Sequence, residues 1–236
     1  MSISAQTLLD RLHGQLVVSC QAASGRPLDA APHIVALAQS AVLGGAKAVR
    51  IEGVSNVRAV RMVVDVPIVG IVKAQQPGFE AFITTRIEEV EALADAGADI
   101  IAFDATDRAR PVPVPELVVA ILHRGCVAMA DISTIGEARQ AIGAGAQVVG
   151  TTLAGYTDYS TKMAGPDFPL MSALASAGLP FVAEGRIWEP AEAARAIALG
   201  AQFVVVGSAI TRPDDITRRY ANAVAAVIRP TPGETA

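Results

Sequence analysis

The chain has 236 residues, of which 52% are hydrophobic and 4% aromatic, and its formal net charge is −4. A negative net charge argues against general nucleic-acid binding, which needs a basic surface. The two cysteines, Cys20 and Cys126, lack the spacing of a disulfide framework or a zinc site. No apolar run reaches the length of a membrane span, and the N-terminus lacks the apolar core of a signal peptide, so we expect a cytoplasmic protein.

Eight short apolar runs alternate with helical stretches along the chain. In chain order the runs are Gln15–Val18, Ala48–Ile51, Ile68–Val72, Ile100–Phe103, Val127–Ala130, Val148-Val149, Phe181–Ala183 and Phe203–Val206. Short strands buried on both faces are typical of parallel β/α units, and eight such units close into a (β/α)8 TIM barrel. We therefore predict an α/β fold with a single barrel domain over residues 1–228. The tail at 229–236 is rich in proline, glycine and threonine, and we expect it to be flexible.

The stretches between the runs carry helix start and stop signals. Ser133 or Thr134 precedes Glu137, as in a capping box. A Gly-Ala pair at positions 45, 97, 145 and 200 precedes four of the runs, where glycine can end a helix in the left-handed conformation. An extra helix over Ser2–His13 is expected to close the barrel bottom. The barrel helices are predicted at His33–Leu43, Asn56–Val64, Ile87–Ala96, Pro115–Arg124, Ile135–Ile142, Asp167–Ala177, Pro190–Leu199 and Asp215–Val227.

The residues that follow the runs are candidates for chemistry, because the active site of such a barrel forms at the C-terminal ends of its strands. Lys73 follows the third run. Burial at the barrel mouth and a nearby cation such as Arg50 would favour its neutral amine. A neutral amine can remove a proton or attack a carbonyl. The alternative is a lysine that only binds an anion or extends outward.

Two further strand ends predict an anion site. Glu184 ends the seventh run and is costly to bury without a partner, while Arg186 offers a fork for a phosphate or carboxylate. The alternative is a structural ion pair between these two residues. Gly207 and Ser208 follow the eighth run, and the loops after strands 7 and 8 of such barrels often hold a phosphate. We therefore predict phosphate binding by Gly185, Arg186, Gly207 and Ser208, with a glycine needed only for the turn as the alternative.

Other polar residues near strand ends give weaker signals. Asp104 and Asp131 have no histidine beside them, so no metal site is predicted. Asp131 either faces the barrel mouth or serves as the N-cap of the helix that follows it. Tyr156 and Thr157 follow the sixth run and are placed to line the mouth. The three histidines fall on or beside predicted helices, which leaves acid–base work to lysine and glutamate. No dinucleotide, P-loop or haem motif is present, and no cofactor is expected.

Taken together, these segments resemble the bacterial N-acetylmannosamine-6-phosphate 2-epimerases of sialic-acid catabolism. The resemblance runs in order from about residue 16 to residue 212, nearly the whole chain, and is specific only as a set. The matching segments are Val18–Gln21, Arg50–Val54, Pro67–Lys73, Asp104–Pro111, Met129–Thr134, Gly150–Thr157, Ala183–Arg186 and Val206–Arg212.

The resemblance implies roles for five residues. Lys73 and Glu184 fall on the positions of the family's acid–base residues. Gln21, Arg50 and Asp131 fall on the positions that contact the sugar. The expected ligand is a small phosphosugar, with a homodimer as one assembly that the sequence allows.

The implied reaction interconverts N-acetylmannosamine 6-phosphate and N-acetylglucosamine 6-phosphate without metal or redox cofactor. Loss of the C2 hydrogen beside the open-chain aldehyde gives an enolate, so a base and a positive group are needed. One departure is that Ala74-Gln75 stand where the family commonly has Arg-Asp, and residues 76–85 also differ, which bears on the sugar fit. Two alternatives are a Schiff-base aldolase and a non-catalytic phosphosugar-binding barrel.

Overall fold

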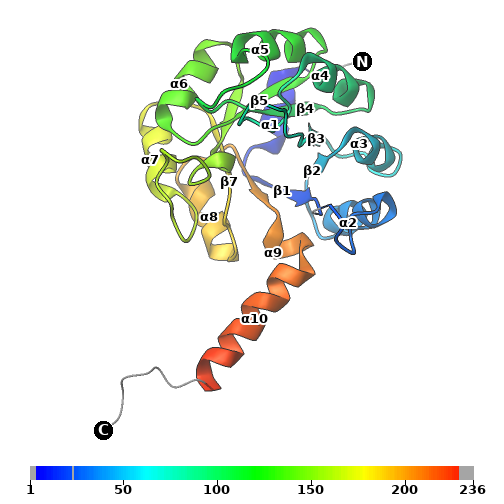
Figure 1. The fold of residues 1–236 in the computed structure, drawn as a ribbon, viewed down its shortest axis with the longest axis vertical. Coiled ribbons are helices and arrows are strands. Elements are labelled where there is room, and N and C mark those ends of the chain that lie inside the picture. The colour runs from blue at the N-terminus through cyan, green and yellow to red at the C-terminus, as the bar shows by residue number, and fades with distance from the viewer. Residues whose placement is uncertain (1–3, 23, 229–236) are drawn as a thin grey trace.

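The structure is a computed structural model that describes residues 4–22 and 24–228. Its strands form a closed parallel barrel in which each strand pairs with the next and β8 pairs with β1, inside a ring of helices (Figure 1). This confirms the predicted (β/α)8 barrel, while the tail predicted to be flexible lies outside the described residues. The strands are β1 (Gln15–Cys20), β2 (Ala48–Glu52), β3 (Ile68–Ile71), β4 (Ile100–Asp104), β5 (Val127–Asp131), β6 (Val148–Gly150), β7 (Phe181–Glu184) and β8 (Phe203–Val206).

Six of the strands continue one or two residues past the predicted apolar run. Asp104, Asp131 and Glu184 are therefore the last residues of their strands rather than the first residues of the following loops. Their backbones are fixed by the sheet, and successive side chains along a strand point to opposite faces. The pleat thus decides which of these acids face the inside of the barrel.

The predicted helices are all present, with each end within three residues of its predicted position. Thr134 and Glu137 form the predicted capping box of α6. The glycines of the four Gly-Ala pairs have φ between 99° and 104°, as their role at helix ends requires. The structure also contains a short helix, α9 (Ser208–Thr211), and a 3-10 turn, η1 (Thr151–Leu153). The longer helices are α1 (Ala5–Leu12), α2 (Ala31–Leu43), α3 (Val54–Arg61), α4 (Ile87–Asp95), α5 (Val114–His123), α6 (Ile135–Gly143), α7 (Phe168–Ser176), α8 (Pro190–Ala198) and α10 (Pro213–Ile228).

The barrel has an outer core and an inner core. The outer core packs the strands against the surrounding helices, whereas the inner core fills the barrel with side chains such as Val69, Ile100 and Phe203. Leu9 and Leu12 of α1 are buried in the inner core, which confirms that an extra helix closes the N-terminal end of the barrel. Because α1 closes the N-terminal end of the barrel, the open end is the one formed by the C-terminal ends of the strands.

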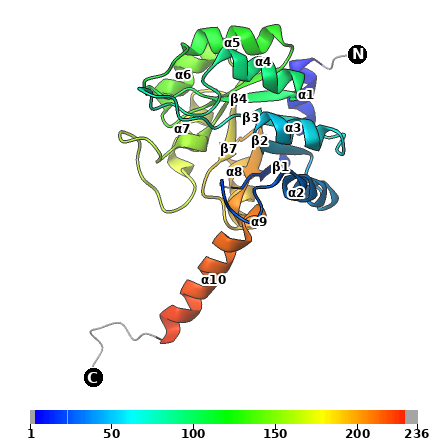
Figure 2. The same ribbon diagram turned by 45° about the vertical axis from the view of Figure 1, so that its right-hand side comes forward.

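The last helix departs from the ring. Figures 1 and 2 show α10 projecting away from the barrel in both views instead of lying along its wall. Its contacts are mainly with the neighbouring α9. Tyr220, Val224 and Val227 are 73%, 63% and 87% exposed. They are spaced four and three residues apart, so they form one apolar stripe that no described residue covers.

Candidate active site

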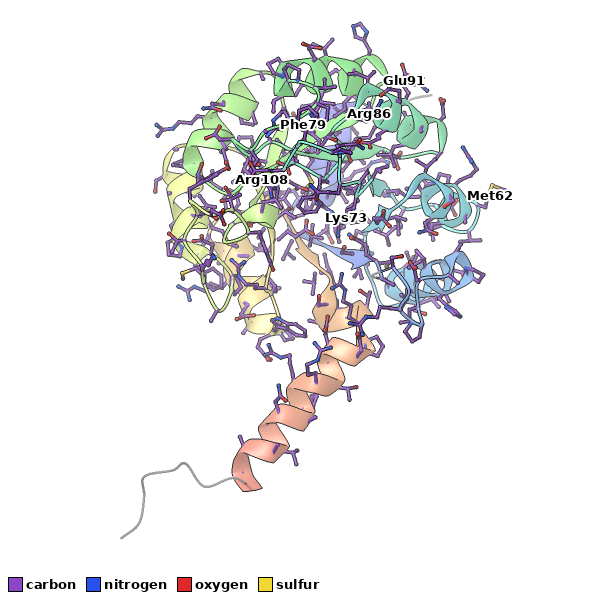
Figure 3. The ribbon with its side chains drawn as sticks, in the orientation of Figure 1. Met62, Lys73, Phe79, Arg86, Glu91 and Arg108 are labelled. Atoms are coloured by element: carbon purple, nitrogen blue, oxygen red, sulfur yellow. The ribbon has the colours of Figure 1, made fainter. Side chains whose placement is uncertain are left out.

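A pocket of about 490 Å³ opens at the C-terminal ends of the strands. Figure 3 shows Lys73 toward the middle of the barrel, whereas Met62 lies on its outer rim. The pocket is lined by residues from the strand ends and the loops that follow them. They are Ser19, Gln21, Arg50, Lys73, Phe82, Ile83, Thr152, Leu153, Tyr156, Glu184, Gly185, Arg186, Ile187, Trp188, Val205, Gly207, Ser208, Thr211 and Arg212.

Lys73 is held with its amine in the pocket. Its Nζ donates to Gln21 Oε1 at 2.7 Å, and Gln21 in turn donates its amide N–H to Ser19 Oγ at 2.6 Å, which orients the amide oxygen toward the lysine. Burial lowers the pKa of Lys73, and the charge of Arg50 lowers it further. One face of the side chain stays open to the pocket. The predicted shift toward a neutral amine is confirmed in direction.

The segment after Lys73 folds back over it. Lys73 forms an antiparallel bridge with Ile83, and the Ala74 N–H donates to the Phe82 carbonyl at 2.9 Å. Thr84 beside this bridge has a φ of 44°, unusual for a β-branched residue, and is fully buried. The residues that differ from the family pattern thus form the wall nearest the lysine, with Phe82 and Ile83 facing the pocket.

Arg50 is the charged centre beneath the pocket, with its side chain 1% exposed. Its Nη2 lies 2.5 Å from Asp131 Oδ2, and its Nη1 lies 2.7 Å from Glu184 Oε2. Burial alone would lower the pKa of Arg50, but the charges of Asp131 and Glu184 outweigh it and raise the pKa. Arg50 therefore stays positive and carries that charge to the pocket wall.

Glu184 shares this centre, and its side chain is 13% exposed. Burial raises its pKa, although the charge of Arg50 opposes the shift. The sequence allowed a structural pair with Arg186, and this is wrong because Glu184 pairs with Arg50 instead. The reason is the backbone after β7: Gly185 and Arg186 have φ values of 110° and 55°, and the Arg186 side chain is directed to loop carbonyls instead of to Glu184.

Arg186 differs from its predicted role. Its Nε donates to the Gly165 carbonyl at 2.8 Å and its Nη1 to the Ala154 carbonyl at 2.7 Å, and the guanidinium lies over the Tyr156 ring at 5.2 Å from its centroid. Two donors of the predicted phosphate fork are thus used on loop carbonyls. Arg186 lines the pocket as a brace for the loop that follows β6, with a backbone φ of 55°.

Two other predicted sugar contacts do not face the pocket. Thr157 is 3% exposed, and its hydroxyl is hydrogen bonded to Ser133 and Ser160 within the loop. Asp131 is fully buried beneath Arg50 and is absent from the pocket lining. Tyr156 does line the pocket and is 58% exposed.

Three of the four residues predicted to bind phosphate line the pocket together with an arginine that was not predicted. Gly185, Gly207 and Ser208 line one side of the pocket, where α9 begins at Ser208. Arg212 also lines this side, and it was not singled out from the sequence. The sequence could have indicated Arg212, because it lies four residues after Ser208 and residues four apart lie on the same face of a helix.

No group of three or more metal-binding side chains occurs among residues 4–22 and 24–228. The three histidines are absent from the pocket lining, in agreement with their predicted places on helices. Within the same described ranges, no helix has both the length and the apolar character needed to cross a membrane. The charged side chains that line the pocket are Arg50, Lys73, Glu184, Arg186 and Arg212.

Comparison with known proteins places the chain in a family. The sequence model of the N-acetylmannosamine-6-phosphate epimerases matches residues 34–226. A protein of Escherichia fergusonii named as an N-acetylmannosamine-6-phosphate 2-epimerase is 48% identical, over 95% of this chain and 98% of its own. The chain belongs to the N-acetylmannosamine-6-phosphate epimerase family. The family resemblance stated from the sequence is thereby confirmed.

The chain is also similar to a bifunctional enzyme and to proteins of known structure. The bifunctional enzyme NanE/NanK of Brucella melitensis is 45% identical over 95% of this chain, which spans 43% of that relative's length. The N-acetylmannosamine-6-phosphate 2-epimerase of Clostridium perfringens has a solved structure with a TM-score of 0.89 and 42% identity, covering 92% of this chain and 96% of that one. A thiamine phosphate pyrophosphorylase of Pyrococcus furiosus, at 17% identity and a TM-score of 0.60, shares the fold alone.

Proposed function

We propose that the protein interconverts the 6-phosphates of N-acetylmannosamine and N-acetylglucosamine by removing and returning the C2 proton. One observation carries this proposal: Lys73, whose pKa is lowered, faces a pocket that is also lined by Arg50 and Glu184, which lie 2.7 Å apart. A base and a fixed positive charge are what an enolate-forming reaction requires. The names of the relatives support the choice of substrate.

In the proposed mechanism, the open-chain sugar places C2 beside the amine of Lys73. Lys73 removes the C2 proton, and the electron pair moves onto the C1 carbonyl oxygen. Arg50, fixed by Asp131, supplies positive charge near that oxygen. Preorganised charge in a site that excludes water is worth more than the same charge in solvent. Glu184 assists ring opening or relays a proton, and return of the proton to the opposite face completes the epimerisation.

We propose that the phosphate binds at the wall formed by Gly185, Gly207, Ser208 and Arg212. Backbone N–H groups at tight turns and a fixed cation are a common phosphate-binding combination. The phosphate would anchor C6 on the β7–β8 side, so that C1 and C2 extend toward Lys73 at β3. Binding energy from this remote group then serves to orient the reacting carbon.

Proton NMR in D₂O tests the proposal. N-acetylmannosamine 6-phosphate incubated with the protein should lose its C2–H signal and give N-acetylglucosamine 6-phosphate without any added cofactor. Activity lost to EDTA and restored by a divalent metal would contradict it. Borohydride treatment should leave the sugar unattached to Lys73, whereas a Schiff-base aldolase would be captured covalently.

We also propose that the protein forms a homodimer through α10. The apolar stripe of Tyr220, Val224 and Val227 has no partner among residues 4–22 and 24–228, and α10 projects away from its own barrel. Each of the other strands is followed by a helix that packs on the barrel wall, whereas α10, which follows β8, projects away from it. The wall beside β8 in a second copy is therefore the place where we expect α10 to pack. Tyr220→Asp should shift the molar mass in light scattering from two chains to one, and an unchanged mass would refute this assembly. The cytoplasmic location stays a prediction.

A further inference from the structure

Thr152 bridges the two carboxylates of the charged centre. It lies in η1, the turn that follows β6, and its hydroxyl is 2.7 Å from Asp131 Oδ1 and 3.1 Å from Glu184 Oε2. The neighbouring Thr151 fixes the Glu184 backbone through hydrogen bonds of 3.0 Å from its N–H and 2.8 Å to its carbonyl. Thr152 therefore stands where it can influence which carboxylate carries a proton.

The arrangement has little room to adjust. Gly150 precedes the turn, and a Cβ at that position would lie 2.8 Å from Asp131 Oδ1 and 3.0 Å from Thr152 Oγ1. Real Cβ atoms do not approach other groups this closely, so only glycine leaves space for this contact. The hydroxyl is thus held between the two acids by the backbone.

Counting protons assigns the direction of each hydrogen bond. A threonine hydroxyl has one proton to donate, so it cannot donate to both acids. The shorter contact, to Asp131, takes that proton. The contact to Glu184 is then favourable only if Glu184 donates, which requires a proton on Oε2.

The charges favour the same assignment. Arg50 is the only cation in direct contact with the two carboxyl groups within the described residues. Lys73 also acts on Glu184, and with Lys73 as the neutral amine of the proposed mechanism, one proton on the two carboxyl groups makes the buried group neutral. Asp131 is contacted by both Arg50 Nη atoms, at 2.5 and 3.3 Å, whereas Glu184 is contacted by one. Asp131 is therefore the better-stabilised anion and Glu184 the acid that keeps the proton.

We propose that Thr152 is a positioning residue that keeps Glu184 in its acid form, accepting a hydrogen bond from Glu184 Oε2 while donating one to Asp131. This inference rests on the proposed epimerase function and assigns Glu184 the part of proton donor. A protonated carboxyl beside the pocket can deliver a proton to a sugar oxygen during ring opening. The proton passes from Glu184 Oε2 to the sugar oxygen, leaving Glu184 as the anion paired with Arg50.

The test compares Thr152→Val with Thr152→Ser. Valine keeps the shape and removes the hydroxyl, and we expect turnover to fall about 10- to 100-fold, the effect of losing one hydrogen bond to an ionisable group. Serine should restore most of the activity. Thr85→Val is the control, because it also removes a threonine hydroxyl from the barrel, and the buried Thr85 hydroxyl has no hydrogen-bond partner among the described residues.

The pH profile separates this role from a structural one. If Thr152 accepts from the acid form, valine makes that form less stable, and the alkaline limb of turnover moves to lower pH. If Thr152 instead donates to the anion, the limb moves to higher pH, which would overturn the proposal. Parental turnover and pH profile in Thr152→Val would overturn it as well.

An infrared measurement makes the outcome independent of catalysis. The parent protein at neutral pH should show a protonated-carboxyl C=O band that disappears in Glu184→Gln and weakens in Thr152→Val. Absence of that band in the parent would refute the acid form of Glu184. Failure of the parent to exchange C2–H would refute the proposed function and leave the infrared result standing on its own.

Discussion

Replacing Arg50 by methionine should destabilise the protein strongly, because the Asp131 carboxylate and the Glu184 carboxyl group then lose their cation inside the barrel. Arg50 is 1% exposed and contacts Asp131, which is fully buried, and Glu184, which is 13% exposed. Breaking a buried ion pair by removing one partner costs about 3–5 kcal/mol. For a chain of this size each kcal/mol lowers the melting temperature by about 2–4 °C, so we expect a drop of roughly 6–20 °C.

Arg124→Met serves as the control, because it removes the arginine of an exposed ion pair instead of a buried one. Arg124 pairs with Asp95 on the surface, with side-chain exposures of 37% and 61%. Exposed pairs contribute about 0–1 kcal/mol, so Arg124→Met should change the melting temperature by at most about 4 °C. Circular dichroism melts of both variants and the parent at pH 8 provide the comparison.

The pH dependence gives a second check with a fixed sign. The charge of Arg50 holds down the pKa of Glu184, which burial has raised, so removing Arg50 raises that pKa further. A carboxyl whose pKa is raised in the folded state destabilises the fold above that pKa, and the cost disappears as the pH falls through it. The gap between Arg50→Met and the parent should therefore be smaller at pH 5 than at pH 8. Equal losses in the Arg50 and Arg124 variants, or a gap that widens at pH 5, would refute the account of the buried centre.

Three further predictions concern the reaction. Lys73→Ala should abolish C2–H exchange in D₂O, while phosphosugar binding measured by calorimetry stays near that of the parent. In the parent, the acid limb of the pH profile of turnover should lie below the ordinary lysine pKa of about 10.4, because burial and the charge of Arg50 lower the pKa of Lys73. Exchange near the parental rate would exclude Lys73 as the base. Glu184→Gln should lower turnover at saturating substrate by about 10²–10⁴ if Glu184 transfers a proton. A loss confined to thermal stability would leave it only an Arg50 partner. Unphosphorylated N-acetylmannosamine should react at least about 100-fold less efficiently, since charge-assisted contacts are lost, and equal kcat/KM values would remove the anchor.

The sequence by itself determined the barrel, its order of elements and most of the pocket. Eight apolar runs separated by capped helices allow one closed parallel arrangement, and that topology brings all the strand ends to one rim. Gln21, Lys73 and Glu184 could therefore be expected to meet before any coordinates were known. The sequence close to each helix end also determines where that helix begins or ends, as the capping box at Thr134 and the left-handed glycines demonstrate.

The tertiary structure alone decided which side chains pair and which face the pocket. Arg50 lies 81 residues from Asp131 and 134 from Glu184, and these contacts depend on strand register and pleat around a closed barrel, which no local pattern encodes. The same holds for Arg186, which turns to loop carbonyls, and for Thr152, whose bridging position arises only when β5, β6 and β7 lie side by side. The amphipathic pattern of α10 predicts a helix, but not whose surface it covers, because an apolar stripe specifies burial without specifying a partner.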